Sequence, residues 1–117
     1  MNIWIIDDNK ALLELLMSSL EDMMWHLYSF SCGQEVLTFP YQPMSAPDVV
    51  ILDWTLPDLP ASIVLEHIKA HYQHVQIIVM SGNSDIEEQL PPSARWLGKP
   101  FRLTTFRQMV ADVASSV

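Results

Sequence analysis

The chain has 117 residues, about the size of one domain with a single core, and we expect residues 1–117 to form one domain. Its net charge of −8 argues against direct binding to nucleic acid or to an anionic membrane surface, because both are negatively charged. The single cysteine, Cys32, excludes an intrachain disulfide, and no apolar run approaches the roughly 18 residues of a membrane span, so we expect a cytoplasmic protein.

The chain begins with a predicted strand and helix. An apolar run over residues 3–6 predicts a buried strand that stops at Asp7 and Asp8, and Asn9 is a suitable N-cap for a following helix. Apolar residues then recur three and four positions apart, which predicts a helix over residues 10–24. The expected apolar face consists of Leu12, Leu15, Leu16, Leu20 and Met23.

A second and a third strand follow. Residues 25–30 are rich in aromatic side chains and predict a strand, and residues 32–39 predict a short helix that ends before Pro40. After a proline-containing loop, residues 49–52 form a continuous apolar run that ends at Asp53. Such a run is typical of a strand that is covered on both faces of the sheet.

The second half of the chain repeats this alternation. A helix is predicted over residues 61–72, a strand over 76–80, a short helix over 84–90, a strand over 94–97 and a last helix over 103–113. Strands that alternate with helices predict a parallel sheet, because each helix supplies the crossover between parallel strands. Five such units fit an α/β, doubly wound, flavodoxin-like sheet with strand order 2-1-3-4-5, in which ligands bind at the carboxyl ends of the strands.

Polar residues follow four of the five predicted strands at that edge: Asp7 and Asp8, Asp53, Ser81 and Lys99. Each has an ordinary explanation when taken alone, such as a strand end or a turn. In the predicted strand order they share one cleft. Crowded carboxylates with no histidine or cysteine nearby are typical of a site for a hard divalent cation, Mg²⁺ first, and the lysine and hydroxyl can bind a tetrahedral anion. This combination is what a phosphoryl-accepting aspartate requires.

These motifs resemble the receiver domain of two-component response regulators. The resemblance rests on the Asp7-Asp8 pair, the run from Asp53 to Pro57, the Ser81-Gly82 step and the Lys99-Pro100-Phe101 triplet, in this order at successive strand ends. The segments 2–8 and 77–85 are most similar to receivers of the nitrogen-regulation subgroup. The resemblance implies a CheY-like protein that signals by conformational change after phosphorylation by a histidine kinase or a phosphotransfer protein.

The resemblance also implies a role for each matching residue. Asp53 is the phosphoacceptor. The expected Mg²⁺ ligands, which could also hold Mn²⁺, are Asp8, Asp53 and the carbonyl of Thr55, with Asp7 holding a metal-bound water. Lys99, Ser81 and the backbone N–H groups of Trp54, Thr55 and Gly82 are expected to bind the phosphoryl oxygens. Thr55 and Asn83 occupy positions that tune phosphate loss, Ser81 and Trp96 occupy the switch positions, and Lys99–Pro100 is a candidate cis peptide bond.

Three features depart from the family pattern. Ala61 stands where receivers usually have glycine, so the loop before it is expected to have a different backbone. Trp96 replaces a smaller switch aromatic, and only a short helix fits between Ser81 and Lys99 because Pro91 and Pro92 interrupt that segment. In the family, the fourth helix, fifth strand and fifth helix form the face that contacts an output domain or a second subunit, so these departures concern signal relay.

Other functions fit the sequence less well. The run from Leu52 to Leu56 mimics the start of a haloacid dehalogenase motif, but it places Ile51 where that nucleophilic aspartate belongs, and no P-loop can be written with the three glycines present. A pseudo-receiver, which would bind partners without phosphorylation, remains the alternative. We expect no enzyme activity beyond the chain's own phosphorylation and dephosphorylation.

Overall fold

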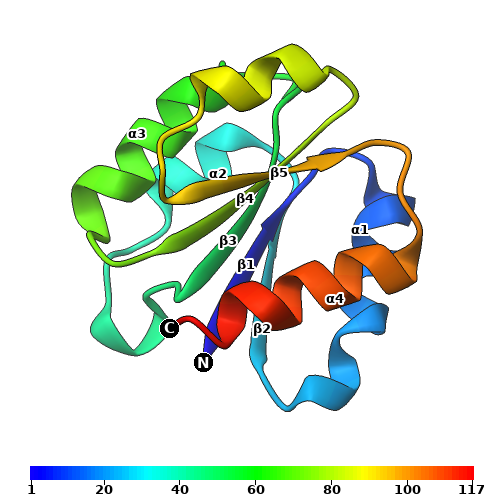
Figure 1. Cartoon of the computed structure of the whole chain (residues 1–117). Helices are drawn as coiled ribbons and strands as arrows, with labels where there is room; N and C mark the ends of the chain where they lie inside the picture. Colours follow the sequence, from blue (N-terminus) through cyan, green and yellow to red (C-terminus); the bar gives the residue numbers. More distant parts are fainter.

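Five parallel strands form one sheet in the order β2-β1-β3-β4-β5 in the computed structural model, which describes all 117 residues (Figure 1). This confirms the predicted fold class and strand order. The strands are β1 Asn2–Ile6, β2 His26–Phe30, β3 Val49–Asp53, β4 Gln76–Ser81 and β5 Ala94–Gly98. The helices are α1 Lys10–Ser19, α2 Gly33–Thr38, α3 Ala61–His71 and α4 Leu103–Ala114, with short 3-10 helices η1 Glu21–Met23, η2 Pro43–Ser45 and η3 Ser84–Gln89.

Helices cover both faces of the sheet. Alternate residues of each strand point to opposite faces, so each face contributes side chains to its own core cluster. Ile3 and Ile5 of β1 pack in one core cluster with α1 and α4, whereas Trp4 and Ile6 pack in a second cluster with α2, α3 and η3. Figure 1 shows α1 and α4 together on one side of the sheet and α2 and α3 on the other. None of the helices is both long enough and apolar enough to cross a bilayer.

The strand register brings the polar strand ends to the same level. Ile6 pairs with Leu52, so the next residue of each chain segment, Asp7 and Asp53, leaves the sheet side by side. On the other side of this edge, Ser81 pairs with Gly98, which precedes Lys99. The central position of β3, buried along its whole length, therefore sets where the carboxylate of Asp53 emerges.

The first helix is shorter than predicted. Residues 10–24 do not form one helix, because α1 ends at Ser19 and Met24 adopts a left-handed conformation with φ 63°. Arg107 of α4 donates a hydrogen bond to the Ser19 carbonyl at 2.7 Å and pairs with Asp22, so these contacts replace a further turn of α1. The apolar face also differs from the prediction, because Leu15 is 54% exposed and Leu13 is buried instead.

The segment after β4 forms only η3, in agreement with the predicted shortened fourth helix. Ile86 is its one buried residue, and the segment turns into β5 after the two prolines at residues 91 and 92. The last helix of the chain is therefore α4, at the position expected for the fifth helix of the fold. Its apolar face is Phe106, Val110 and Val113, whereas Leu103 at its start is 41% exposed.

Candidate phosphoacceptor site

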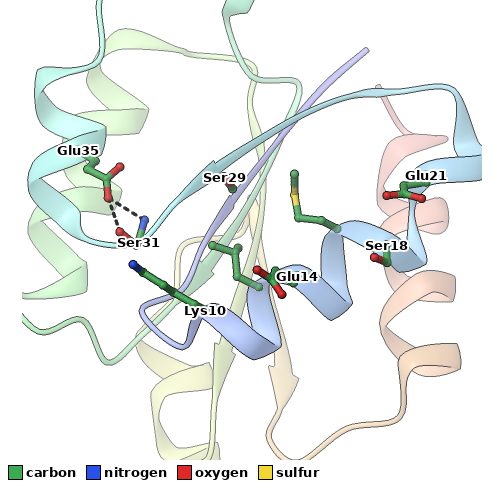
Figure 2. Close-up of a pocket in the computed structure, with 9 residues that line it drawn as sticks. Lys10, Glu14, Ser18, Glu21, Ser29, Ser31 and Glu35 are labelled. Atoms are coloured by element: carbon green, nitrogen blue, oxygen red, sulfur yellow. Dashed lines mark hydrogen bonds between the residues drawn. The ribbon is translucent and has the colours of Figure 1, made fainter.

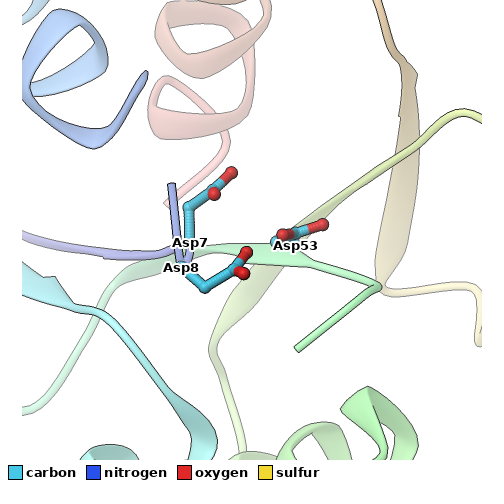
Figure 3. A group of neighbouring side chains, drawn as sticks. All are labelled: Asp7, Asp8 and Asp53. Carbon is cyan, nitrogen blue, oxygen red and sulfur yellow. The ribbon is translucent and has the colours of Figure 1, made fainter. Parts of the chain in front are cut away.

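Three carboxylates gather at the carboxyl edge of the sheet. Asp7 and Asp8 follow β1, Asp53 is the last residue of β3, and one oxygen from each lies within 4.8 Å of the others (Figure 3). Asp7 is fully buried and Asp53 is 4% exposed, while Asp8 faces solvent. The structure thus brings together the acidic residues that the sequence places at separate strand ends.

Lys99 supplies the positive charge of this cluster. Its Nζ atom lies 3.1 Å from Oδ2 of Asp7 and 3.4 Å from Oδ1 of Asp53, and the lysine side chain is 27% exposed. The peptide bond between Lys99 and Pro100 is cis, and the Lys99 N–H donates to the carbonyl of Ser81 at 2.8 Å. One cation therefore faces two buried carboxylates, which leaves an excess of negative charge at the site.

Burial raises the pKa of Asp53 from its ordinary value of 3.8 to about 6. A hydrogen bond from the Thr55 N–H to Oδ1 of Asp53, at 3.2 Å, opposes this increase. The neighbouring charge of Asp7 adds to it and Lys99 lowers it again. Asp53 is therefore mostly ionised at neutral pH, but its charge is held in an unfavourable environment.

The donor atoms of this cluster fit a small, hard divalent cation. Oxygen ligands of one Mg²⁺ lie about 2.1 Å from the ion and so at most about 4.2 Å from one another, which is close to the present spacing. The Asp8 carboxylate is exposed to solvent, the Asp53 carboxylate is almost buried beside it, and the Thr55 backbone lies next to Asp53. Oxygen ligands also suit Mn²⁺.

Ser81 and the two residues after it lie at the same edge. Ser81 is 7% exposed, and its hydroxyl accepts a hydrogen bond from the Asn83 N–H at 3.0 Å. Gly82 and Asn83 are exposed, and the Asn83 side chain accepts from the Asp85 N–H. The hydroxyl oxygen thus accepts a bond within its own turn, and the hydroxyl makes no hydrogen bond to Asp53 or Lys99.

One expected phosphoryl-binding group is engaged elsewhere. The N–H of Trp54 donates to the carbonyl of Met80 at 2.9 Å, which extends the contact between β3 and β4 by one residue. It is therefore not available to a phosphoryl oxygen in this conformation. This contact arises from the strand register, which the motif alone does not reveal.

The loop from residue 54 to residue 60 needs no glycine. Met24 is the only non-glycine residue with a positive φ, and no glycine has one either, so Ala61 begins α3 in an ordinary backbone conformation. Ala61 is 3% exposed, which leaves its small side chain packed in the core. The replacement of the usual glycine is therefore compatible with the fold.

Trp96, at the expected switch position, lies over its own strand. A Cβ atom at Gly98 would come within 2.7 Å of the Trp96 ring, so the ring occupies the space above this glycine. The indole Nε1 is buried without a hydrogen-bond partner, which is unfavourable for a polar group. The half-buried ring packs against the core cluster that contains α3.

We predict that Trp96→Phe changes the free energy of unfolding by less than about 1 kcal/mol, because loss of the unpaired N–H offsets part of the lost apolar contact. The matched control is Trp4→Phe. The Trp4 Nε1 donates to the Ser45 carbonyl at 3.1 Å, and its replacement should destabilise the protein by about 2 kcal/mol. Urea denaturation of both variants measures the difference, and equal losses would contradict the prediction.

A hollow of about 540 Å³ lies between α1 and β2 (Figure 2). Glu14 and Glu21 lie on one side of it and Glu35 on the other, and Lys10 at the start of α1 also lines it. No residue of the aspartate cluster lines it. The candidate site is therefore separate from this hollow and is defined by the aspartate cluster at the carboxyl edge of the sheet.

Comparison with known proteins identifies the family of the chain. Residues 3–111 match the family model described as "Response regulator receiver domain". The chain is a response regulator receiver domain. Its receiver sequence is 31% identical over 103 residues to the transcriptional regulatory protein CssR of Bacillus subtilis, across 85% of this chain and 44% of CssR. It is 26% identical over 102 residues to the DNA-binding transcriptional regulator NtrC of Klebsiella pneumoniae, across 84% of this chain and 21% of NtrC.

The relatives thus include NtrC, from the nitrogen-regulation subgroup that the sequence resembles. CssR is similar to this chain at a comparable level of identity. The receiver domain spans less than half the length of either relative. Solved structures have the same fold. A receiver domain from Clostridium thermocellum has a TM-score of 0.82 at 24% identity, covering 98% of this chain and 94% of that one. TrrA of Thermotoga maritima, in complex with Mg²⁺ and beryllium fluoride, has a TM-score of 0.78 at 23% identity, covering 96% and 97%.

Proposed function

We propose that this receiver domain accepts a phosphoryl group on Asp53 in a Mg²⁺-dependent reaction. The donor would be the phosphohistidine of a sensor histidine kinase or of a phosphotransfer protein, or a small phosphodonor. The observation that carries the proposal is the environment of Asp53. Its carboxylate is buried at the end of the central strand, 3.4 Å from Nζ of Lys99 and beside the carboxylates of Asp7 and Asp8.

Each group of the site has a part in this reaction. An oxygen of Asp53 attacks phosphorus, the bond from phosphorus to the donor nitrogen breaks, and the electron pair stays on the leaving imidazole. Lys99, the Ser81 hydroxyl and the N–H groups of Thr55 and Gly82 would bind the phosphoryl oxygens, since the Trp54 N–H is already bonded. The Ser81 hydroxyl accepts the Asn83 N–H, so its own O–H is free to donate to a phosphoryl oxygen.

The cation would be held by the carboxylates of Asp8 and Asp53 and by the Thr55 carbonyl, with Asp7 binding a metal-bound water. Mg²⁺ bound there would neutralise negative charge that builds up between the carboxylates and the phosphoryl group. TrrA, one of the similar structures, contains Mg²⁺ together with beryllium fluoride, and the DrrB receiver domain is described as BeF3 activated. Both support the assignment of this chemistry to the shared fold.

The same site would release the phosphoryl group by attack of water on phosphorus. Thr55 and Asn83, both exposed beside Asp53 and Ser81, are placed to affect access of this water. The chain would therefore catalyse only its own phosphorylation and dephosphorylation and would have no separate substrate.

The partners follow from this role. A histidine kinase or phosphotransfer protein would deliver the phosphoryl group in the cytoplasm. The signal would pass through η3, β5 and α4 to an output domain of the same gene product or to a second copy. Arg95, Thr105 and Gln108 are exposed on the β5 and α4 part of this face and could contact such a partner.

A pseudo-receiver is the second candidate. Two observations favour it: the Trp54 N–H is already bonded to the Met80 carbonyl, and the large Trp96 ring lies over Gly98. In that case, the chain would keep the partner-binding face and would not respond to a phosphodonor.

One experiment separates the two functions. We would incubate the protein with Mg²⁺ and acetyl phosphate and measure its intact mass, and we would record its NMR spectrum with Mg²⁺ and beryllofluoride. The proposal predicts one phosphoryl adduct that Asp53→Asn abolishes and that Asp85→Asn, an exposed aspartate of η3, leaves unchanged. No adduct in the wild type, or an adduct that persists in Asp53→Asn, would exclude Asp53 as the acceptor.

A further inference from the structure

The loop between β3 and α3 carries part of the proposed site. Its Thr55 N–H contacts Asp53 at 3.2 Å, and the Thr55 carbonyl is a proposed cation ligand. The loop lacks the glycine usual in the family, and no side chain caps the N-terminus of α3. The first residue of the loop, Trp54, is held by its N–H bond to the Met80 carbonyl of β4. The residues from Thr55 to Pro60 need a different support.

Asp58 ties the loop to the first turn of α2. Its Oδ1 accepts a hydrogen bond from the Gly33 N–H at 2.9 Å, and its Oδ2 accepts one from the Gln34 N–H at 2.8 Å. Cys32, the N-cap residue of α2, makes no side-chain capping bond, so the cap comes from a segment more than twenty residues away. Bonds from Gln34 and then Gly33 lower the pKa of Asp58, so it accepts both bonds as a carboxylate.

Apolar contact supports the same junction. Leu59 follows Asp58 and lies so close to Gly33 that a Cβ atom at residue 33 would come within 3.0 Å of its Cδ1 atom. Val64 of α3 lies at the same distance from this position. The loop is thus pressed against α2 by packing as well as by two charge-assisted hydrogen bonds.

We propose that Asp58 is a positioning residue for the phosphoacceptor site: by binding the first turn of α2, it fixes the loop that presents the Thr55 backbone to Asp53 and to the cation. This inference rests on the proposed function. Asp58 lies three residues from Thr55, and Pro57 between them restricts the backbone. Fixing Asp58 on α2 therefore also restricts the position of the Thr55 backbone. Partners that orient metal ligands in this way typically change metal affinity or activity by about 10- to 100-fold when removed.

The test compares Asp58→Ala with Asp58→Asn and with the control Asp112→Ala, an exposed aspartate on α4 whose side chain also accepts a hydrogen bond. We expect Asp58→Ala to weaken Mg²⁺ binding, measured by calorimetry with Mg²⁺ alone, and to slow acetyl phosphate labelling, each by about 10-fold. Asp58→Asn, which keeps one acceptor oxygen, should fall between, and Asp112→Ala should match the wild type. In NMR spectra of the metal-free protein, the Thr55 amide signal should shift in Asp58→Ala.

A double variant separates positioning from simple helix capping. Cys32→Ser places a capping hydroxyl on α2 itself, where residue 32 already has the extended conformation of an N-cap. Added to Asp58→Ala, it should restore thermal stability and leave Mg²⁺ affinity low. Restored Mg²⁺ affinity in the double variant, or wild-type affinity in Asp58→Ala, would overturn the inference. If acetyl phosphate does not label the wild type, the proposed function is refuted. The positioning role of Asp58 is then still tested by Mg²⁺ affinity and by the Thr55 amide signal.

Discussion

Asp53→Asn is expected to stabilise the metal-free protein at pH 8 by about 3 kcal/mol. In the folded protein, burial raises the Asp53 pKa from 3.8 to about 6. A difference of roughly two pKa units corresponds to about 3 kcal/mol of unfavourable free energy for the ionised form in the folded state. Asparagine has nearly the same shape and carries no charge, and its side-chain oxygen can still accept the Thr55 N–H.

The sign of the pH dependence follows from the two pKa values. Between about pH 4 and pH 6 the folded protein retains the Asp53 proton that the unfolded chain has released, so this group makes stability fall as pH rises. Above about pH 7 the penalty is complete, and well below pH 4 it is absent because both states are protonated. The advantage of Asp53→Asn should therefore be near zero at pH 4 and grow to its full value by about pH 7.

Urea denaturation in a chelator from pH 4 to pH 8 measures this difference, with Asp85→Asn as the control that should show no such trend. Addition of Mg²⁺ should stabilise the wild type more than Asp53→Asn, because the cation acts on the ionised carboxylate. A stability difference that does not change with pH would show that Asp53 keeps an ordinary pKa. The penalty has a functional meaning in the proposed reaction, since a carboxylate in an unfavourable site gains from a bound cation.

The main features of the fold and of the site could be predicted because they depend on local patterns. Continuous apolar runs that end in Asp7, Asp53 and Ser81 identify buried strands and their polar ends at once. Parallel strands place these ends at one edge, and the strand order makes the relevant strands neighbours. The cluster of three carboxylates with Lys99 is therefore a consequence of topology as much as of motif.

The remaining features depend on contacts between distant segments. Arg107 binds the Ser19 carbonyl at the end of α1, and Asp58 in the β3–α3 loop binds the first turn of α2. Neither pairing has a local sequence pattern. Asp58 lies between two prolines, and this sequence pattern predicts only that it is a turn residue, with no sign of its contact with α2. Likewise, the Trp54 N–H is bonded because of the β3–β4 register, which sequence patterns do not specify.

Lys99→Met should reduce the stability of the metal-free protein by about 2–3 kcal/mol at pH 7.5. The lysine pairs with Asp7, which is fully buried, and with Asp53, so its removal leaves two buried carboxylates without a cation. Loss of one partner of a buried pair typically costs about 3–5 kcal/mol, and the partial exposure of Lys99 reduces this value. Methionine keeps most of the apolar length of the side chain, so the loss reports mainly on charge.

The same variant should gain more stability from Mg²⁺ than the wild type does. Lys99 repels a cation bound to Asp8 and Asp53, and in its absence the excess negative charge is larger. Thermal denaturation over a Mg²⁺ titration measures this gain, because a ligand of the folded state stabilises it in proportion to the logarithm of its concentration over its Kd. Lys69→Met, which removes a lysine bonded to Ser93 on the α3 side, should leave the Mg²⁺ response unchanged. A smaller response in Lys99→Met than in the wild type would mean that the lysine organises the carboxylates for the cation rather than competing with it.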